Sequence, residues 1–289
     1  MTPIDYGRPM EFGISLVPAA QDFPALARAT RLADELGFEF AGFQDHPYQR
    51  RFLDTWTLIS ALGAQTSRIR LFPDVACLPL RPPAVLAKAV ASLDVISGGR
   101  AELGLGAGGL WDAIRGMGGP VREPGDSILA LEEAIEISRL IWSGQRGLRF
   151  AGRFYQLEGI HSGPVPLHDV EIWLGVYRPR GLELTGRLAD GWLPSLGYAK
   201  PEELPEKQAR IDEAADKAGR NRNAIRRLLN VGGDLRADQL TELALEYGMD
   251  TFIVWFEGDL DRYIRRFAEE IAPAVRAEVS NQRRRHSSL

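Results

Sequence analysis

One local pattern recurs along almost the whole chain: a short run of β-forming residues, a turn, and then an amphipathic helix. In the first unit, "FGISLV" precedes a helical stripe of apolar residues that Gly37 ends. The predicted strands of the eight units are 12–17, 38–44, 68–75, 101–106, 170–175, 191–196, 225–233 and 251–256. Strands that alternate with helices pair in parallel through right-handed crossovers, and eight such units close a barrel. The sequence therefore predicts an α/β fold, a single (β/α)8 TIM barrel.

The barrel is predicted to occupy residues 10–277 as one domain, followed by a polar, basic tail at 278–289 that we expect to be disordered. The segment "GLRFAGRFYQLEG", residues 147–159, interrupts the pattern. Its alternation predicts a small hairpin inserted after the fourth helix, at the end of the barrel opposite the site, where it would serve packing or a subunit contact. An open doubly wound sheet is the alternative fold. Its phosphate-binding glycines would follow the first strand, where "VPAAQDF" contains none.

Composition excludes several classes of function. The formal net charge of -4 argues against nucleic acid as the main partner, because neutralising phosphates requires clustered Lys and Arg. The single cysteine, Cys77, cannot form an internal disulfide, and no apolar run approaches the ~18 residues of a membrane span. The opening segment "MTPIDYGRPM" has no apolar signal region. We therefore expect a cytoplasmic protein, with no membrane or nucleic-acid partner, that acts on a small molecule.

In a closed barrel, functional residues lie in the loops that follow the strands, whereas the loops that precede the strands serve stability. The segments selected by this rule are 45–46, 74–77, 107–112, 176–180 and 194–198. The loop at 107–127 has 21 residues, which is too long for a simple connection and typical of a functional loop. We therefore expect the site at this rim.

His46 is the only histidine on the predicted rim. A neutral imidazole beside Asp45 at a strand end is suited to moving one proton near pH 7. The alternative is a turn histidine held by a backbone carbonyl. A catalytic metal has little support, because the rim offers one histidine and scattered aspartates without an H-x-H or H-E-x-x-H pattern. Since a G-x-S-x-G elbow is also missing from the sequence, a bound cofactor is the expected source of reactivity.

The stretch "AELGLGAGGLWD", residues 101–112, removes side chains at a strand end and then supplies an indole and a carboxylate. Ala107 and Gly108 would let a flat ring approach the backbone, with Trp111 and Asp112 on the wall of the same pocket. The alternative is a junction that needs only a positive φ, with Trp111 packed in the core. Rim aromatic residues could line an apolar pocket for an uncharged organic molecule or could pack the barrel. They are Phe43, Tyr48, Trp111 and Tyr198.

The segment "VYRPR", residues 176–180, places Pro179 near the start of a helix, where its missing N–H costs nothing. The amides of Tyr177 and Arg178 should then point away from the helix N-terminus, and with the Arg178 and Arg180 side chains they could hold a phosphate. The alternative is an ordinary capped helix with solvated arginines.

Three stretches together resemble one family. They are "QDH" at 44–46, "DVACLPLRPPAVLAKAVASLDVISGGRAELGLGAG" at 74–108 and "IWLGVYRPRGLELTGRLADGWLPS" at 172–195. This order of motifs is similar to that of the luciferase-like oxidoreductases, which use FMN or the deazaflavin coenzyme F420. The resemblance implies a barrel, often a homodimer, with an isoalloxazine-type ring across the strand ends.

Carried over residue by residue, the resemblance implies a role for each matching position. Asp45 would contact the ring or its chain, and His46 would be the proton donor or a substrate contact. A non-proline cis peptide between Asp74 and Val75 would press on the back face of the ring. Positions that would contact the ring edge, the ribityl chain or the phosphate are Ala107, Gly108, Asp112, Gly175, Val176, Tyr177, Arg178 and Ser195.

One position departs from the family pattern. The deazaflavin sugar-phosphate dehydrogenases have a glutamate where this chain has Gly109, so we do not predict a sugar-phosphate substrate. Asp112 is the nearest carboxylate in sequence that could replace that acid or base.

Hydride transfer between reduced F420 and a small organic substrate, with His46 moving the matching proton, is the predicted function. One alternative is an FMN-dependent monooxygenase that receives reduced flavin from a separate reductase. The loop "VGGDLRAD" at 231–238 is short, whereas an oxygen intermediate needs a seal against water, which favours F420. The other alternative is a barrel that binds a ligand without catalysing a reaction.

Overall fold

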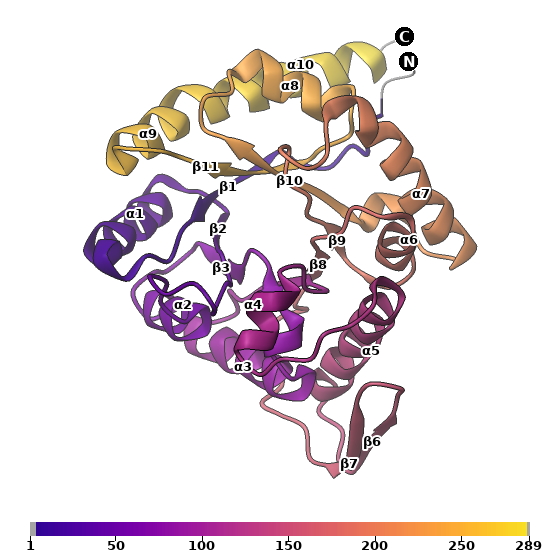
Figure 1. The fold of residues 1–289 in the computed structure, drawn as a ribbon. Coiled ribbons are helices and arrows are strands. Elements are labelled where there is room, and N and C mark those ends of the chain that lie inside the picture. The colour runs from indigo at the N-terminus through magenta and orange to yellow at the C-terminus, as the bar shows by residue number, and fades with distance from the viewer. Residues whose placement is uncertain (1–3, 288–289) are drawn as a thin grey trace.

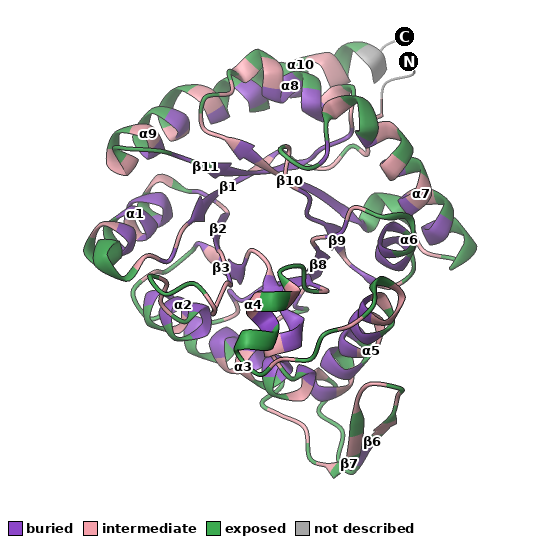
Figure 2. Ribbon diagram, viewed as in Figure 1, coloured by how far each residue is buried: buried purple, intermediate pink, exposed green. Residues whose placement is uncertain are grey.

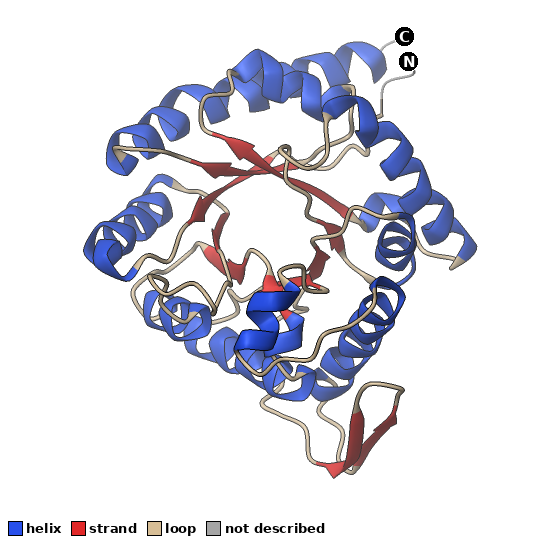
Figure 3. Ribbon diagram, viewed as in Figure 1, coloured by secondary structure: helices blue, strands red, loops and turns tan. Residues whose placement is uncertain are grey.

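The structure, a computed structural model, describes residues 4–287 and contains one parallel sheet surrounded by helices (Figures 1 and 3). The strands of this sheet are β1 (Glu11–Leu16), β2 (Phe40–Phe43), β3 (Arg70–Pro73), β4 (Ala76–Cys77), β5 (Leu103–Gly106), β8 (Ile172–Leu174), β9 (Gly191–Trp192), β10 (Arg226–Gly232) and β11 (Thr251–Trp255). Neighbours in the order β3-β2-β1-β11-β10-β9-β8-β5-β4 pair in parallel. The alternation of strands and helices in the sequence thus produces the expected parallel topology.

The barrel closes through the third predicted strand, which is divided into β3 and β4. β3 pairs with β2, and β4 pairs with β5 on the other side. Two backbone hydrogen bonds join β3 to the residues ahead of β5, from Leu71 N to Arg100 O (2.8 Å) and from Glu102 N to Leu71 O (3.0 Å). Because β3 and β4 occupy one strand position, the nine segments form a barrel with eight strand positions. This confirms the predicted barrel, and the open-sheet alternative is wrong.

Helices form the outer ring, and their buried faces turn toward the sheet (Figure 2). Their bounds are α1 (Phe23–Leu36), α2 (Thr55–Gly63), α3 (Pro83–Ser97), α4 (Trp111–Gly116), α5 (Pro124–Trp142), α6 (Pro179–Leu188), α7 (Leu204–Lys217), α8 (Ala237–Leu245), α9 (Leu260–Arg266) and α10 (Ala272–Ser287). Gly37 ends α1 with φ of 83°, a conformation that few other residues adopt without strain. No helix in the described part of the chain is long and apolar enough to cross a membrane.

Two segments lie outside the regular barrel. β6 (Leu148–Ala151) and β7 (Gln156–Ile160) pair as an antiparallel hairpin beside α5. Glu133 of α5 fixes the hairpin turn by accepting hydrogen bonds from the backbone N–H groups of Arg153, Phe154 and Tyr155. The hairpin is thus attached to the barrel by a polar contact.

The predicted tail differs from the structure. α10 continues through Ser287, so the described residues from 278 onward are helical rather than disordered. Val279 is buried, and the Arg283 guanidinium binds the Asp5 carboxylate (2.7 Å) and the Arg8 carbonyl (2.7 Å). Residues 288 and 289 lie outside the described part. The C-terminal residues therefore dock on the N-terminal segment, which the basic composition alone did not indicate.

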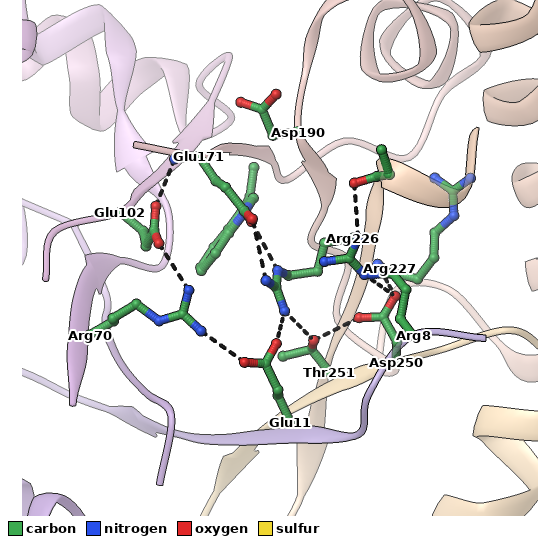
Figure 4. Close-up of polar contacts among 12 residues, drawn as sticks. Arg8, Glu11, Arg70, Glu102, Glu171, Asp190, Arg226, Arg227, Asp250 and Thr251 are labelled. Atoms are coloured by element: carbon green, nitrogen blue, oxygen red, sulfur yellow. Dashed lines mark hydrogen bonds and ion pairs between the residues drawn. The ribbon is translucent and has the colours of Figure 1, made fainter. Parts of the chain in front are cut away.

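A network of buried charges plugs the barrel at the amino ends of its strands (Figure 4). Arg226 contacts Glu11, Glu171 (2.9 Å) and Thr251 (3.3 Å). Arg70 contacts the same Glu11 (2.9 Å) and also Glu102 (3.3 Å). Burial alone would raise the pKa of Glu171, but the Arg226 guanidinium holds it below its usual range.

An apolar layer lies above this network inside the barrel. It consists of Phe40, Phe72, Trp173, Leu193, Leu228 and Ile253, all buried, with Val75 packed against them. The guanidinium of Arg70 lies 4.1 Å from the centre of the Phe40 ring, which connects the two layers. These two layers of side chains fill the interior of the barrel, so we expect a ligand site at the carboxyl ends of the strands.

Replacing Arg226 with alanine should destabilise the fold strongly, because the half-buried Glu171 would lose its cation and Glu11 would keep only Arg70. We expect Arg226→Ala to lower the free energy of unfolding by about 3–5 kcal/mol. The matched control is Arg210→Ala, which removes an exposed ion pair with Glu206 and should cost less than about 1 kcal/mol. Urea denaturation followed by circular dichroism measures both. Equal losses for the two variants would contradict this account of the network.

Candidate functional site

Residues 74–81, the connecting segment, hold together the loops at the carboxyl ends of the strands. The Asp74 N–H donates to the Phe43 carbonyl (2.7 Å) at the end of β2. The Cys77 N–H donates to the Asp45 carboxylate (3.0 Å), while β4 pairs with the end of β5. The loops after β2 and β5, which are far apart in sequence, are therefore neighbours at the barrel mouth.

Val75 forms a small apolar platform at this mouth. The Asp74–Val75 peptide bond is cis, as predicted. The half-buried Val75 side chain rests on the apolar layer and fills space left by glycines of β5 and the β8 loop. A Cβ atom on Gly106 would lie 2.7 Å from Val75 Cγ2, and one on Gly175 would lie 3.1 Å from it. A Cβ atom on Gly104 would overlap the Pro73 carbonyl. The alternating glycines of "LGLG" are therefore required by the approach of residues 73–75.

His46 is half-buried in the loop after β2. Its Nδ1 lies 2.7 Å from the Tyr48 hydroxyl, and its ring also neighbours Phe52. Burial lowers the pKa of His46, although the charge of Asp45 opposes this shift, so the imidazole is neutral at pH 7. Burial also raises the pKa of Tyr48 to about 12, which keeps its hydroxyl protonated. That hydroxyl can donate to Nδ1 or accept from it, so Nε2 can be an N–H donor or an acceptor toward a ligand.

Asp45 contacts other parts of the protein, whereas the resemblance implied that it would contact the cofactor ring or its chain. Its side chain is fully buried, and its carboxylate binds Arg81 (2.7 Å) in addition to the Cys77 N–H. Arg81 also reaches Asp54 (2.7 Å), the N-cap of α2. Since both Asp45 oxygens are occupied within the protein, we interpret Asp45 as the residue that fixes the His46 loop to the connecting segment.

Gly108 and Trp111 form one compact turn after β5. Gly108 has φ of 98°, and a Cβ atom there would lie 2.8 Å from Pro79 and 2.9 Å from the Trp111 indole. The half-buried indole therefore covers the turn. Ala107 is also half-buried at the end of β5, whereas a Cβ atom on Gly109 would meet open space. Gly108 is thus needed both for its backbone angle and for the close approach of the ring.

Two predicted site residues do not lie in the site. Asp112 begins the short helix α4 with its side chain 96% exposed and paired with Arg115 (2.7 Å), so it lacks the burial that would make it a catalytic acid. Phe43 is completely buried in the outer core between the sheet and the helices, so it cannot line a substrate pocket. The remaining predicted pocket aromatics are more accessible: Tyr48 and Trp111 are half-buried, and Tyr198 is 79% exposed against Tyr177.

The N-terminus of α6 is open to solvent at the same rim. Arg178 is its N-cap and Pro179 its first residue, and no side chain of the described protein caps it. The Val176 carbonyl accepts a hydrogen bond from Trp192 Nε1 (2.8 Å), which fixes the backbone that leads into the helix. With the exposed Arg178 and Arg180 side chains, this terminus can bind an anion such as a phosphate.

Sequence reasoning missed two polar residues at the mouth, Ser15 and Asn230. They contact the Asp74 carboxylate from β1 and β10, two strands separated by β11, with Ser15 Oγ at 3.2 Å and Asn230 Nδ2 at 3.0 Å. Asn230 Nδ2 also lies 3.3 Å from Ser195 Oγ. The available signal was a polar residue within an otherwise apolar strand, as in "GISL" and "LLNV".

Trp255 is a further residue that the sequence did not indicate. It is 43% exposed at the end of β11. On one side of it, a groove of about 520 Å³ opens between the ends of β1 and β11, lined in part by Ser15 and Val17. This groove adjoins the mouth and has room for a small organic molecule. No cluster of three or more metal-binding side chains occurs among the described residues.

Comparisons with known proteins agree with this geometry. The model of the luciferase-like monooxygenase family matches residues 10–281. The chain is 31% identical over 216 residues to 5,10-methylenetetrahydromethanopterin reductase of Archaeoglobus fulgidus, covering 75% of this chain and 61% of that protein. It is 32% identical over 224 residues to F420-dependent glucose-6-phosphate dehydrogenase of Nocardia farcinica, covering 74% of this chain and 65% of that protein.

Among solved structures, an F420-dependent secondary alcohol dehydrogenase in complex with an F420–acetone adduct has the same fold. The TM-score is 0.80 at 17% identity, and the match covers 93% of this chain and 99% of the other. The family match extends from the start of β1 into α10 and so includes every strand of the barrel. The chain belongs to the luciferase-like monooxygenase family.

Proposed function

We propose that this protein is an oxidoreductase that binds coenzyme F420 at the barrel mouth and transfers a hydride between it and a small, uncharged organic substrate. The observation that carries the proposal is the Val75 platform together with the neutral His46 at the same mouth. Gly106 and Gly175 leave the space that the Val75 side chain occupies. A flat ring needs an apolar surface on one face, and a hydride transfer needs a partner for the matching proton.

The residues at the mouth fit such a cofactor. Val75 offers an aliphatic surface, and Ala107 and Gly108 leave the backbone accessible beside it. The open N-terminus of α6 provides backbone amides for the phosphate of the cofactor chain, with Arg178 nearby. When bound, the deazaflavin supplies or accepts the hydride, and the protein holds the ring and moves the proton.

His46 is the residue that we propose for the proton. In the oxidising direction the neutral imidazole, in the tautomer whose Nδ1–H donates to the Tyr48 hydroxyl, accepts the substrate hydroxyl proton at Nε2 and becomes imidazolium. In the reducing direction the imidazolium returns that proton to the substrate oxygen. Asp45 and Arg81 hold the loop that positions this ring. The thiol of Cys77 has no such role, because burial raises its pKa to about 11 and keeps it protonated.

The identities of the relatives support F420 over FMN, since relatives above 30% identity include F420-dependent enzymes. The structure adds that only residues 233–236 separate β10 from α8, so no long insertion is available there to seal an oxygen intermediate from water. Glucose-6-phosphate is not carried over as a substrate, because Gly109 supplies no carboxylate. A homodimer and a separate reductase, both implied by the resemblance, stay predictions.

Titration with the two cofactors tests the binding site directly. We expect F420 to quench protein fluorescence with a dissociation constant on the order of micromolar, and FMN to bind at least about tenfold more weakly. Gly106→Ala should weaken F420 binding about tenfold, because its Cβ displaces Val75. The control Gly116→Ala adds a methyl group in open space and should bind F420 normally. Tighter binding of FMN than of F420 would contradict the cofactor assignment, and normal affinity in Gly106→Ala would contradict the platform.

Replacement of His46 tests the chemistry. Reduced F420 is mixed with a panel of small ketones, aldehydes and unsaturated ketones, and its oxidation is followed by absorbance. His46→Asn should lower the rate about 100-fold and change the F420 affinity less than about threefold. His161→Asn, at an exposed histidine away from the mouth, is the control and should react normally. A non-catalytic binding protein would instead bind F420 equally in all three forms and turn over nothing.

A further inference from the structure

Asp74 occupies an unusual position inside the barrel mouth. Its carboxylate lies above the apolar layer and accepts hydrogen bonds from Ser15 of β1 (3.2 Å) and Asn230 of β10 (3.0 Å). Gly42 of β2 makes room for it, because a Cβ atom there would lie 3.1 Å from the Asp74 Cβ. The Asp74 side chain therefore contacts β1 and β10 and packs against β2, at the level where the cofactor ring is proposed to lie.

No cation in the described part of the chain neutralises this carboxylate. Arginines contact the carboxylates Glu11, Glu102 and Glu171 at the closed end of the barrel. By contrast, no Lys, Arg or His within the described residues comes within 4.0 Å of the Asp74 oxygens. Its partners are a neutral hydroxyl and a neutral amide. An ionised carboxylate without a cation tolerates burial poorly, so its charge depends on how much water reaches it.

The acid strength of Asp74 agrees with this environment. Burial raises the pKa of Asp74 to about 6, although the hydrogen bonds from Asn230 and Ser15 oppose the shift. The titratable group that faces it is the Tyr177 phenol, whose pKa is raised by burial and, to a smaller extent, by the charge of Asp74. Tyr177 therefore stays neutral near pH 7, and Asp74 is the group of this cluster that changes charge between pH 5 and 8.

A second observation indicates that the cluster is built to meet a ligand. Asn230 donates its amide hydrogens toward Asp74 (3.0 Å) and Ser195 (3.3 Å), but its Oδ1 is buried without a donor in the described structure. A buried acceptor without a partner is costly, and ligands that donate an N–H next to a carbonyl would satisfy it. The carbonyl of such a ligand would then lie near the Asp74 carboxyl group, which can donate a hydrogen bond only when it is protonated.

We propose that Asp74 is a proton-binding positioning residue of the cofactor site: it takes up a proton when a flat ring covers the mouth, and the neutral carboxyl group then donates a hydrogen bond to the bound ring. The inference rests on the proposed function for the identity of the ring. Covering the mouth removes the remaining water from the carboxylate, which disfavours its charged form. Binding of the ring and binding of the proton therefore favour one another.

The sign of the pH dependence follows from this linkage. In the free protein the Asp74 pKa is about 6, and in the complex it is higher. Below pH 6 the group is protonated in both states, so affinity does not depend on it. Above pH 6 binding must bring in a proton, and the affinity falls by up to about tenfold per pH unit until the pKa of the complex is passed. Burial lowers the pKa of His46, so its imidazole is already neutral at pH 7.5 and contributes no proton at that pH.

The experiment is calorimetric titration with F420 at pH 7.5 in two buffers of different ionisation enthalpy, which gives the number of protons bound per F420. Protons that the cofactor itself gains or loses are common to all variants. We expect Asp74→Asn to take up close to one proton fewer than the wild type and to keep its affinity as the pH rises from 6 to 8. Asp112→Asn, an exposed carboxylate outside the mouth, is the matched control and should behave like the wild type.

Two further measurements keep the proposal testable if Asp74→Asn does not fold. Ser15→Ala removes a hydrogen bond that lowers the Asp74 pKa, so the onset of the affinity loss should move to higher pH. Infrared difference spectra of the wild type should gain a protonated-carboxyl band when F420 binds. Equal proton uptake by Asp74→Asn and the wild type, or the absence of that band, would overturn the inference and leave the cofactor site intact. Failure of F420 to bind the wild type would instead contradict the proposed function.

Discussion

The division of the third strand at Asp74–Val75 is the constraint on which the rest of the structure depends. β3 must pair with β2 and β4 with β5, or the sheet does not close. The chain accomplishes this change of partner at the mouth, where the cis bond lies. Because Val75 then occupies the interior, β5 and the β8 loop must carry glycine where they face it. The same segment, residues 73–77, therefore closes the barrel and forms the platform.

The two ends of the barrel use polar groups in opposite ways. At the amino ends of the strands, buried carboxylates and arginines alternate, and each charge has a partner (Figure 4). Such a network stabilises the fold only when its charges are paired. At the carboxyl ends, the buried Asp45 is paired with Arg81, whereas Asp74 has only neutral partners and Asn230 Oδ1 has no donor in the described structure. The proposed ligand site therefore lies at the end where a carboxylate has no cationic partner.

The sequence predicted the barrel and the neutral rim histidine, because the alternation of strands and helices and a lone histidine after a strand are local signals. The cis bond was predicted only through the resemblance to the family. The prediction failed for residues whose role depends on whether the side chain points into the barrel or out toward the helices. In β2, Phe40 points into the barrel, so Phe43, three residues on, points outward to the helices. The same parity turns Ser15 and Asn230 inward, with Ile14 and Leu229 outward. Asp112 was misplaced because the local helix α4 carries it into solvent.

Burial shifts the pKa values of His46 and Asp74, two titratable groups of the mouth, in opposite directions and favours the neutral form of each. It lowers the pKa of the cationic acid His46 and raises that of the carboxylic acid Asp74. The nearest fixed anion, Asp45, is paired with Arg81. A ring that covers the mouth strengthens both shifts, so the reacting groups would lie in a cavity without an isolated charge. A hydride carries its own charge, and the dipoles of the backbone and of the α6 N-terminus would then govern its transfer.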